Sequence, residues 1–206
     1  MKPREVNVEE ARIVDTLRGP RGGVHLSDIL QYIRKSLGKS MKELSSEDFH
    51  RFKMGEGFEA GVLSRGLKIN LQEHHDHMWK GYNFELNGIS LTTDAVCFGC
   101  EKHPLVWEIK LTWFGTKKEV EAPEFRVYHY QLMAYVYALQ LELQKKVVGR
   151  FVFGYVNGNY TTERFPRIRA WDCAYSEKEL HENWRMILRV KSEMEEAGLL
   201  KGEKNG

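Results

Sequence analysis

The sequence predicts a mixed α/β domain in which helices flank a central mixed β-sheet. The hydrophobic period is helical up to about residue 66, changes to that of strands over residues 68–112, and becomes helical again after residue 124. A chain of 206 residues fits a single domain over 1–206. We divide it into an N-terminal helical part (1–66), the sheet with a long helix (67–173) and a C-terminal helix with a tail (174–206).

Helix ends are marked by capping residues and stop signals. Ser27 is a candidate N-cap and Gly38 a stop signal for the first helix, and Ser176 with Glu179 forms a capping box that opens the last one. The expected helices run over 27–37, 45–66, 124–146 and from 176 onward.

Strands are expected where β-branched and aromatic residues follow one another between turn signals. Asn87-Gly88 and Asn157-Gly158 are typical of tight hairpin turns. The expected strands are Lys68–Gln72, Tyr82–Leu86, Ile89–Phe98, Leu105–Thr112 and Val147–Val156.

A hairpin brings two carboxylates together in the middle of the chain. If the turn after Phe98 centres on residue 101 or 102, Asp94 lies opposite Glu108 or Ile109. Cβ atoms of cross-strand neighbours are about 4.5–5.5 Å apart, so both carboxylates can bind one cation. Glu108 and Lys110 share a face of their strand, while Ile109 points into the core.

Two carboxylates and a backbone carbonyl suit a hard cation such as Mg²⁺. The bound metal would polarise a phosphate and lower the pKa of a water molecule. Lys110 would orient that water or neutralise the charge that develops on the phosphate. The sequence therefore predicts a site for phosphodiester hydrolysis.

A plain structural interpretation competes with this one, since the pattern Asp…Glu-x-Lys also fits ion pairs on a solvent-facing strand. The strand around Glu108 is apolar at residues 105–107, 109 and 111, however, and looks buried on both faces. A buried charge costs several kcal/mol unless it is paired or binds a metal. This context favours the metal site.

Two helices contribute further polar residues. Glu59 lies where the helical pattern calls for an apolar residue, and Gly55 and Gly57 nearby suggest close approach of backbone or ligand. Gln131 and Tyr135 are four residues apart on the buried side of their helix, so both can reach toward the carboxylates.

Together these residues resemble the PD-(D/E)XK nuclease superfamily, in particular its RecB-like and lambda-exonuclease-like branch. Four motifs occur in family order: Gly55-x-x-x-Glu59, Asp94, Glu108-x-Lys110 and Gln131-x-x-x-Tyr135. The resemblance implies a restriction-endonuclease-like fold. It also implies that Asp94, Glu108, the Ile109 carbonyl and Glu59 bind Mg²⁺ or Mn²⁺, that Lys110 acts on the attacking water, and that Gln131 and Tyr135 hold DNA.

The sequence departs from the family pattern at two places. Thr93 stands where the family usually has a proline. Residues 26–35 resemble the beginning of CRISPR-associated RecB-like exonucleases, but Tyr32 replaces a cluster cysteine and no cysteine triplet follows. No iron–sulfur cluster is therefore expected, and packing of Tyr32 and the C-terminal helix could replace it.

Other polar segments are weighed more briefly. Trp113, Lys117, Lys118 and Arg126 could contact nucleic acid from the loop and the helix that follow the catalytic strand. The pair Cys97-x-x-Cys100 lacks the second pair that a zinc site needs, so we interpret it as structural. The histidines of residues 74–77 could bind a metal, but they fit a polar loop better.

The favoured function is a metal-dependent exonuclease that hydrolyses DNA from its ends in recombination, repair or phage replication. A flap endonuclease with the same site and a catalytically silent DNA-binding module are the alternatives. The net charge of +2 neither requires nor excludes DNA. Three cysteines argue against a disulfide framework and for the cytoplasm, the absence of a long apolar run argues against a membrane span, and a homo-oligomer is compatible with the sequence.

Overall fold

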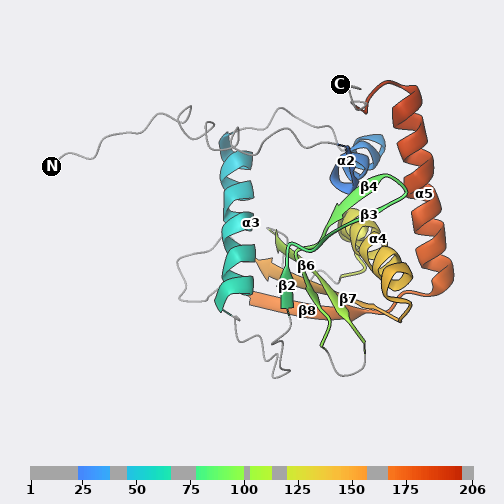
Figure 1. Ribbon diagram of the computed structural model, residues 1–206. Coiled ribbons are helices and arrows are strands. Elements are labelled where there is room, and N and C mark those ends of the chain that lie inside the picture. The colour runs from blue at the N-terminus through green and yellow to red at the C-terminus, as the bar shows by residue number, and fades with distance from the viewer. Residues whose placement is uncertain are drawn as a thin grey trace.

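The computed structural model describes residues 23–37, 46–65, 78–99, 103–112, 120–156 and 167–200. The mixed α/β class is confirmed, with two mixed sheets and four helices in the described residues (Figure 1). The helices are α2 (Leu26–Ser36), α3 (Ser46–Arg65), α4 (Arg126–Leu143) and α5 (Glu177–Glu196), with a 3₁₀ turn, η2 (Pro123–Phe125), before α4.

The larger sheet has five strands and holds the centre of the molecule. Its order is β2 (Met78–Lys80), β5 (Ala95–Cys97), β6 (Leu105–Thr112), β7 (Val148–Tyr155) and β8 (Arg167–Cys173). The pair β6–β7 is parallel and the other pairs are antiparallel. Parallel neighbours need a crossover connection, which α4 provides.

The smaller sheet lies beside the larger one and has three strands in the order β1 (Val24–His25), β4 (Ile89–Thr92) and β3 (Asn83–Leu86). The turn between β3 and β4 is at Asn87-Gly88, as predicted, and both residues have positive φ angles, 53° and 67°. Such angles are those of the tight hairpin turns that Asn-Gly favours.

The predicted strand Ile89–Phe98 is wrong as a single element, because the chain leaves the small sheet after Thr92 and joins the large sheet at Ala95. Thr93 N donates to Tyr82 O (3.0 Å), and Gly81 N donates to Asp94 O (3.1 Å). The backbone therefore changes its pairing partners at Thr93 and Asp94.

Helix bounds agree with the prediction more closely at the C-terminal end of the chain. Ser176 and Glu179 form the predicted capping box of α5. The predicted cap at Ser27 is wrong: His25 is the N-cap of α2, and its N–H is bonded to the Asp28 carboxylate. The predicted start at Glu124 is also shifted, because Pro123–Phe125 forms the 3₁₀ turn. The expected strand at 68–72 and the turn at 157–158 lie outside the described residues.

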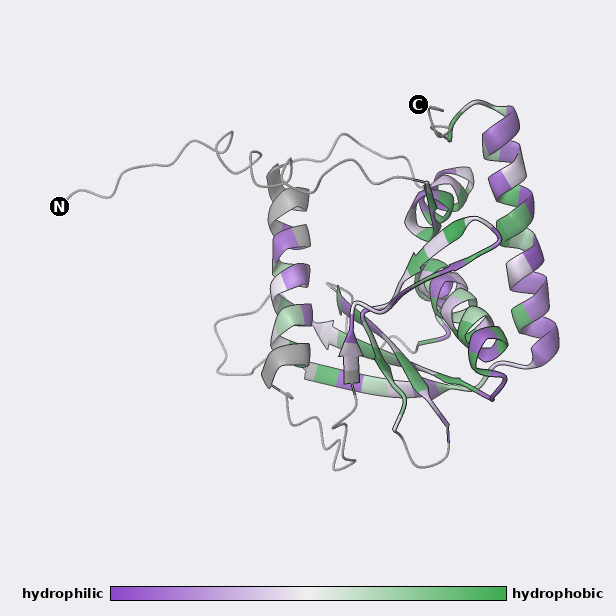
Figure 2. Ribbon diagram, in the orientation of Figure 1, coloured by the Kyte–Doolittle hydropathy of each residue, from purple (hydrophilic) through white to green (hydrophobic). Residues whose placement is uncertain are grey.

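The two faces of the large sheet bury different hydrophobic clusters. Hydrophobic residues alternate with polar ones along its strands (Figure 2). One face packs against α4 and contributes to the larger core, which also includes α2 and α5. The opposite face packs against α3 through Phe58 and Val62, which contact the cluster around Trp107, Ile109 and Val152. The predicted inward direction of Ile109 is confirmed, since its exposed fraction is 2%.

Helix α2 packs against α5, and Tyr32 lies near this contact. The Tyr32 side chain is half-buried against the core and borders a cavity of about 350 Å³ with Met194, Leu199 and Leu200. No helix among the described residues has the length and apolar character that crossing a membrane requires.

The contact of α3 with the sheet depends on a glycine in β7. A Cβ at Gly154 would lie 2.6 Å from the Phe58 ring and 2.9 Å from Leu111. The missing side chain therefore lets α3 approach the sheet.

We expect Gly154→Val to push α3 away from the sheet and to lower the free energy of unfolding by about 1–3 kcal/mol. Gly57→Ala is the matched control, because Gly57 is in α3 and has open space around its Cα. There alanine should stabilise the helix by about 0.5–1 kcal/mol. Urea unfolding of both variants measures the difference, and equal stability of Gly154→Val and wild type would contradict the packing role.

Candidate active site

Asp94 lies where the chain passes from the small sheet to the large one. The register Ala95↔Trp107 continues to place Asp94 level with Glu108. Instead of extending the backbone ladder, the Asp94 carboxylate accepts a hydrogen bond from Ile109 N at 2.6 Å, through Oδ2. The predicted juxtaposition of Asp94 with Glu108 and Ile109 is therefore present, and a backbone hydrogen bond fixes the orientation of the acid.

Glu108 is an acid inside the protein, with an exposed fraction of 0%. Its Oε1 atom lies 2.5 Å from Lys110 Nζ, and the same ammonium lies 3.6 Å from Asp94 Oδ2. Glu108 Oε2 is fully buried and accepts no hydrogen bond from the described residues. Because buried oxygen atoms of proteins are almost always paired, this one calls for a further positively charged or hydrogen-bonding partner.

Burial and mutual attraction shift the pKa values of this group of charges. Burial raises the pKa of Glu108 to about 8, while Lys110 lowers it and the Asp94 carboxylate raises it. Burial also disfavours the Lys110 ammonium, but Glu108 and Asp94 outweigh this effect, so the pKa of Lys110 lies above its ordinary value. Lys110 therefore remains a cation at neutral pH.

A single cation would satisfy this arrangement chemically. Glu108 Oε2 lacks a donor, Asp94 is held beside it, and the Ile109 carbonyl belongs to the strand between Glu108 and Lys110. Two carboxylates and a carbonyl are the oxygen ligands that Mg²⁺ or Mn²⁺ accepts, with water completing the shell. The residues present thus fit the metal that the sequence predicts.

Glu59 does not join the two acids as a third neighbour. Within the described residues, no three His, Cys, Asp or Glu side chains are close enough together to hold a metal ion. The reason is that α3 packs on the face of the sheet opposite Glu108. Glu59 borders the same cavity as Lys110 and is close enough for its charge to raise the pKa of Glu108. Metal binding by Glu59, in the same site or in an added one, stays a prediction.

The sequence predicts that backbone or a ligand lies close to Gly55 and Gly57. A Cβ at either position would meet no described atom within 4 Å. Gly55 borders the cavity instead. Gly55 therefore leaves its part of the cavity border without a side chain.

Tyr135 holds the backbone next to the site in place through its hydroxyl group. Its hydroxyl group donates to Thr92 O at 2.6 Å and accepts from Gln131 Nε2 at 2.8 Å. With an exposed fraction of 3%, Tyr135 holds the end of β4, two residues before Asp94. Burial next to Glu108 and Asp94 raises its pKa well above the ordinary value. The DNA contacts expected of Tyr135 and Gln131 stay predictions, and of these two residues Gln131 borders the cavity.

We expect Tyr135→Phe to lower kcat by about 10–100-fold and to weaken metal binding, because Thr92 and with it Asp94 lose their anchor. The affinity for DNA should stay within a factor of two to three of wild type, since Tyr135 is not among the residues that border the cavity. Tyr137→Phe is the matched control, because Tyr137 is in the same helix as Tyr135 but its hydroxyl lies near His181 of α5 and not at the site. Single-turnover rates and Mn²⁺ titrations measure both; equal rates of the two variants would remove Tyr135 from the site.

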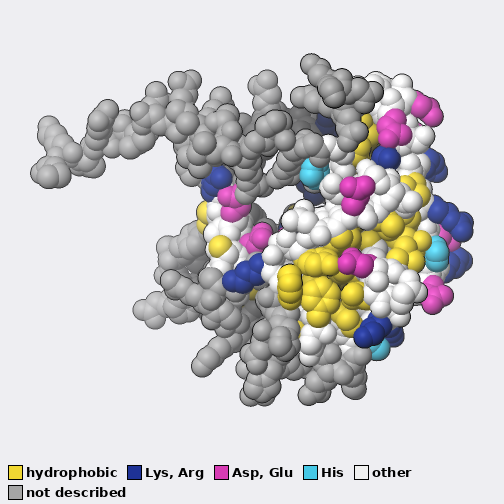
Figure 3. All heavy atoms as spheres, in the orientation of Figure 1, with side chains coloured by type: hydrophobic (Ala, Val, Ile, Leu, Met, Phe, Trp, Pro, Cys, Tyr) yellow, Lys and Arg dark blue, Asp and Glu magenta, His cyan; other side chains and the backbone are white. Residues whose placement is uncertain are grey.

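A cavity of about 910 Å³ opens beside Lys110. It is bordered by α2, α3, β2 and α4, and charged side chains of both signs lie along α3 next to the opening between α3 and the sheets (Figure 3). Its polar lining includes residues that the sequence reasoning missed: Ser27, Gln31, Arg34, Arg51, Lys80 and Tyr128. The spacing of polar residues along 27–34 is a signal that could have indicated the α2 part of this wall.

The remaining predicted contacts are distributed differently. Arg126 is exposed at the start of α4 and does not border the cavity, so its DNA contact stays a prediction. Trp113, Lys117, Lys118, Cys100 and residues 74–77 lie outside the described residues. Cys97 is fully buried, which agrees with a structural position.

Comparisons with known proteins give distant structural similarity. No family model matches this sequence, and no curated protein has a similar sequence. Among crystal structures, the protein SSO0001 is similar with a TM-score of 0.47 and 14% identity, over 88% of this chain and 84% of that one. A protein from Eubacterium rectale that is named as a candidate exonuclease is similar with a TM-score of 0.41 and 13% identity, over 98% of this chain and 71% of that one. Similarity this distant leaves the function to be argued from the site itself.

Proposed function

We propose that this protein is a nuclease that hydrolyses phosphodiester bonds of DNA with the help of Mg²⁺ or Mn²⁺. The observation that carries the proposal is the fully buried Glu108 Oε2, which lacks a hydrogen-bond donor among the described residues beside Asp94 and Lys110. Because buried carboxylate oxygens are almost always paired, this one calls for a further partner beyond the ion pair with Lys110. A divalent cation would be a suitable partner for this oxygen. Hydrolysis of a phosphodiester is a reaction for which proteins bind such a cation.

The two acids and the lysine would have different roles in the reaction. A bound divalent cation would polarise the phosphate and lower the pKa of a water molecule. Asp94 and Glu108 would hold that cation, and the hydrogen bond from Ile109 N fixes the orientation of the Asp94 carboxylate. Tyr135 keeps the preceding backbone in place through Thr92.

Lys110 acts as a permanent positive charge in this scheme. Because its pKa is raised, it cannot take a proton from water near neutral pH. The ammonium instead donates hydrogen bonds to the attacking water or to a phosphate oxygen and neutralises the charge that develops there. The cavity beside it leaves room for the strand that carries this phosphate.

The finer assignment is an exonuclease that removes nucleotides from DNA ends in recombination, repair or phage replication. Its support is the order of the four motifs, from Gly55-x-x-x-Glu59 to Gln131-x-x-x-Tyr135. The cavity is bordered on two sides by helices, α2 and α3, which fits a chain guided past Lys110.

The test compares linear and circular single-stranded DNA of equal length, labelled internally, with Mg²⁺, with Mn²⁺ and with excess chelator. We expect the linear substrate to be shortened progressively with either metal, the circle to remain intact, and chelator to stop all cleavage. Cleavage of the circle would replace the exonuclease by an endonuclease at the same site. Equal cleavage in chelator, or none with either metal, would contradict a metal-dependent nuclease.

A further inference from the structure

One face of α2 is polar and borders the cavity of the candidate active site. Ser27, Gln31 and Arg34 are spaced by four and three residues, so they lie along one stripe of the helix, and all three line the cavity. The other side of α2 is buried in the core and consists of Leu26, Ile29, Leu30 and Ile33. The helix is therefore fixed by its apolar side and presents its polar stripe to the cavity.

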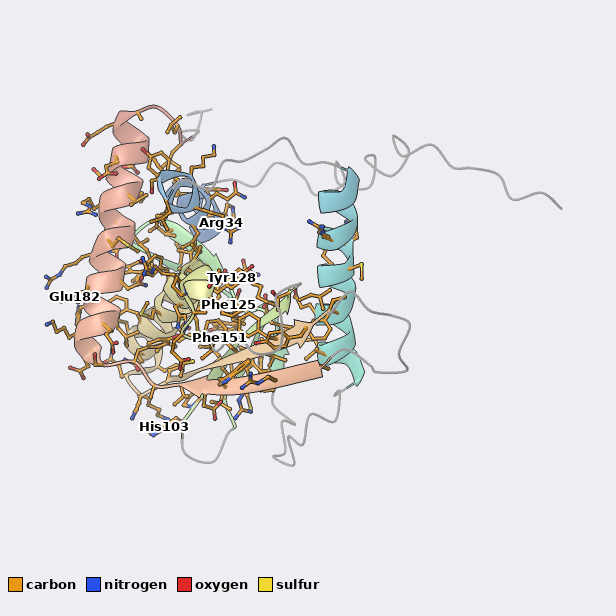
Figure 4. All side chains as sticks on the ribbon, turned by 180° about the vertical axis from the view of Figure 1, so that it is seen from behind. Arg34, His103, Phe125, Tyr128, Phe151 and Glu182 are labelled. Atoms are coloured by element: carbon orange, nitrogen blue, oxygen red, sulfur yellow. The ribbon has the colours of Figure 1, made fainter. Side chains whose placement is uncertain are left out.

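Arg34, in the last turn of α2, is held by an aromatic ring. Its guanidinium carbon lies 5.8 Å from the centre of the Tyr128 ring, and Lys110 Nζ lies 6.0 Å from the same ring centre. Arg34 and Tyr128 are beside each other on the side of the body that faces α3 (Figure 4). Within the described residues, no carboxylate lies within ion-pair distance of Arg34.

This arrangement differs from that of an ordinary surface arginine. An arginine that lies over an aromatic ring loses part of its freedom but keeps its planar N–H donors available. Because Tyr128 contacts both cations, it sets the position of Arg34 relative to Lys110. A second positive charge, held against Tyr128, thus borders the same cavity as Lys110 and has no described carboxylate within ion-pair distance.

We infer that Arg34, seated on Tyr128 and flanked by Gln31, forms a subsite for a second phosphate of the nucleic acid strand, apart from the phosphate that is cleaved at Lys110. The inference rests on the proposed function, because it takes DNA as the ligand of the cavity. A guanidinium can bind a phosphate through two parallel hydrogen bonds, and the Gln31 amide can donate a third. The subsite holds the strand in register without reading its sequence.

The test measures binding separately from cleavage. A fluorescein-labelled single-stranded oligonucleotide is titrated with the full chain in excess chelator, by fluorescence anisotropy, at four or more salt concentrations. The variants are Arg34→Ala and the matched control Lys35→Ala. Lys35 is the next residue of α2 and carries the same charge, but it is exposed and borders the cavity of Tyr32 and Met194 instead.

We expect Arg34→Ala to weaken binding about tenfold or more at low salt, as the loss of a charged hydrogen bond does. The slope of log K against log salt should become shallower by about 0.7 for each phosphate that the variant no longer neutralises. Lys35→Ala should bind within about twofold of wild type with an unchanged slope. Arg34→Lys keeps the charge but loses the planar fork, so it should keep the slope and bind with intermediate affinity.

The inference is overturned if Arg34→Ala and Lys35→Ala bind the oligonucleotide with equal affinity and equal salt dependence. It is also overturned if the wild-type chain does not bind DNA. If Arg34→Ala does not melt cooperatively, the comparison of Arg34→Lys with Lys35→Ala decides, and equal affinities there overturn it too. Cleavage in Mn²⁺ is measured in parallel. If Arg34→Ala binds DNA more weakly but wild type does not cleave it, the subsite is retained and the nuclease is refuted. If wild type cleaves DNA but Arg34→Ala binds it as wild type does, the nuclease is retained and the subsite is refuted.

Discussion

Replacement of Glu108 by glutamine should abolish DNA cleavage without harming the fold. Glutamine has the shape of glutamate, but it lacks the negative charge that a divalent cation needs. We expect the rate to fall on the order of 1000-fold or more, because the cation and its bound water lose their ligand. Single-turnover cleavage of end-labelled DNA at saturating Mn²⁺ measures this loss.

Stability separates this explanation from a structural ion pair. An ionised Glu108 inside the protein opposes folding. In the absence of metal, the free energy of unfolding of Glu108→Gln should therefore lie within about 1 kcal/mol of the wild-type value or above it. Lys110 keeps Asp94 as a partner at 3.6 Å. Glu85→Gln, at an exposed position of β3, is the control and should change neither property. If Glu108→Gln is destabilised but cleaves DNA at the wild-type rate, the ion pair of Glu108 with Lys110 has a structural role only.

The local part of the site could be predicted from the sequence because it lies on one hairpin. The apolar run of residues 105–112 defines β6 fully, and the alternation of side chains assigns Glu108 and Lys110 to one face and Ile109 to the other. Counting back from the turn then places Asp94 beside them. Each of these steps depends on residues that are close in sequence.

The parts that could not be predicted depend on contacts between distant segments. The change of sheet at Thr93 and Asp94 requires hydrogen bonds with Tyr82 and Gly81, which pattern reasoning does not supply. Strands as short as β1 and β2 have too few residues for a period to appear. The place of Glu59 depends on the face of the sheet that α3 covers, and that choice is made where Phe58 packs over Gly154.

Binding of Mn²⁺ should stabilise the protein more at pH 8.5 than at pH 6.5. The pKa of Glu108 is raised from its ordinary value of 4.5 to about 8, chiefly by burial. A raised carboxyl pKa stabilises the metal-free fold below pH 4.5, and this contribution is lost progressively as the pH rises through 8. Over the same interval a cation must displace the proton, so the apparent affinity for metal should rise up to about tenfold for each pH unit and level off above about pH 8.

Thermal unfolding with and without saturating Mn²⁺, from pH 5.5 to 9, measures this dependence. The metal-free melting temperature should decline across the interval while the increment caused by Mn²⁺ grows. In Glu108→Gln both trends should be much weaker, because position 108 no longer exchanges a proton, and Glu85→Gln should behave as wild type does. An Mn²⁺ increment that is independent of pH, or one that Glu108→Gln retains in full, would mean that the cation binds elsewhere. The buried oxygen of Glu108 would then need a different partner.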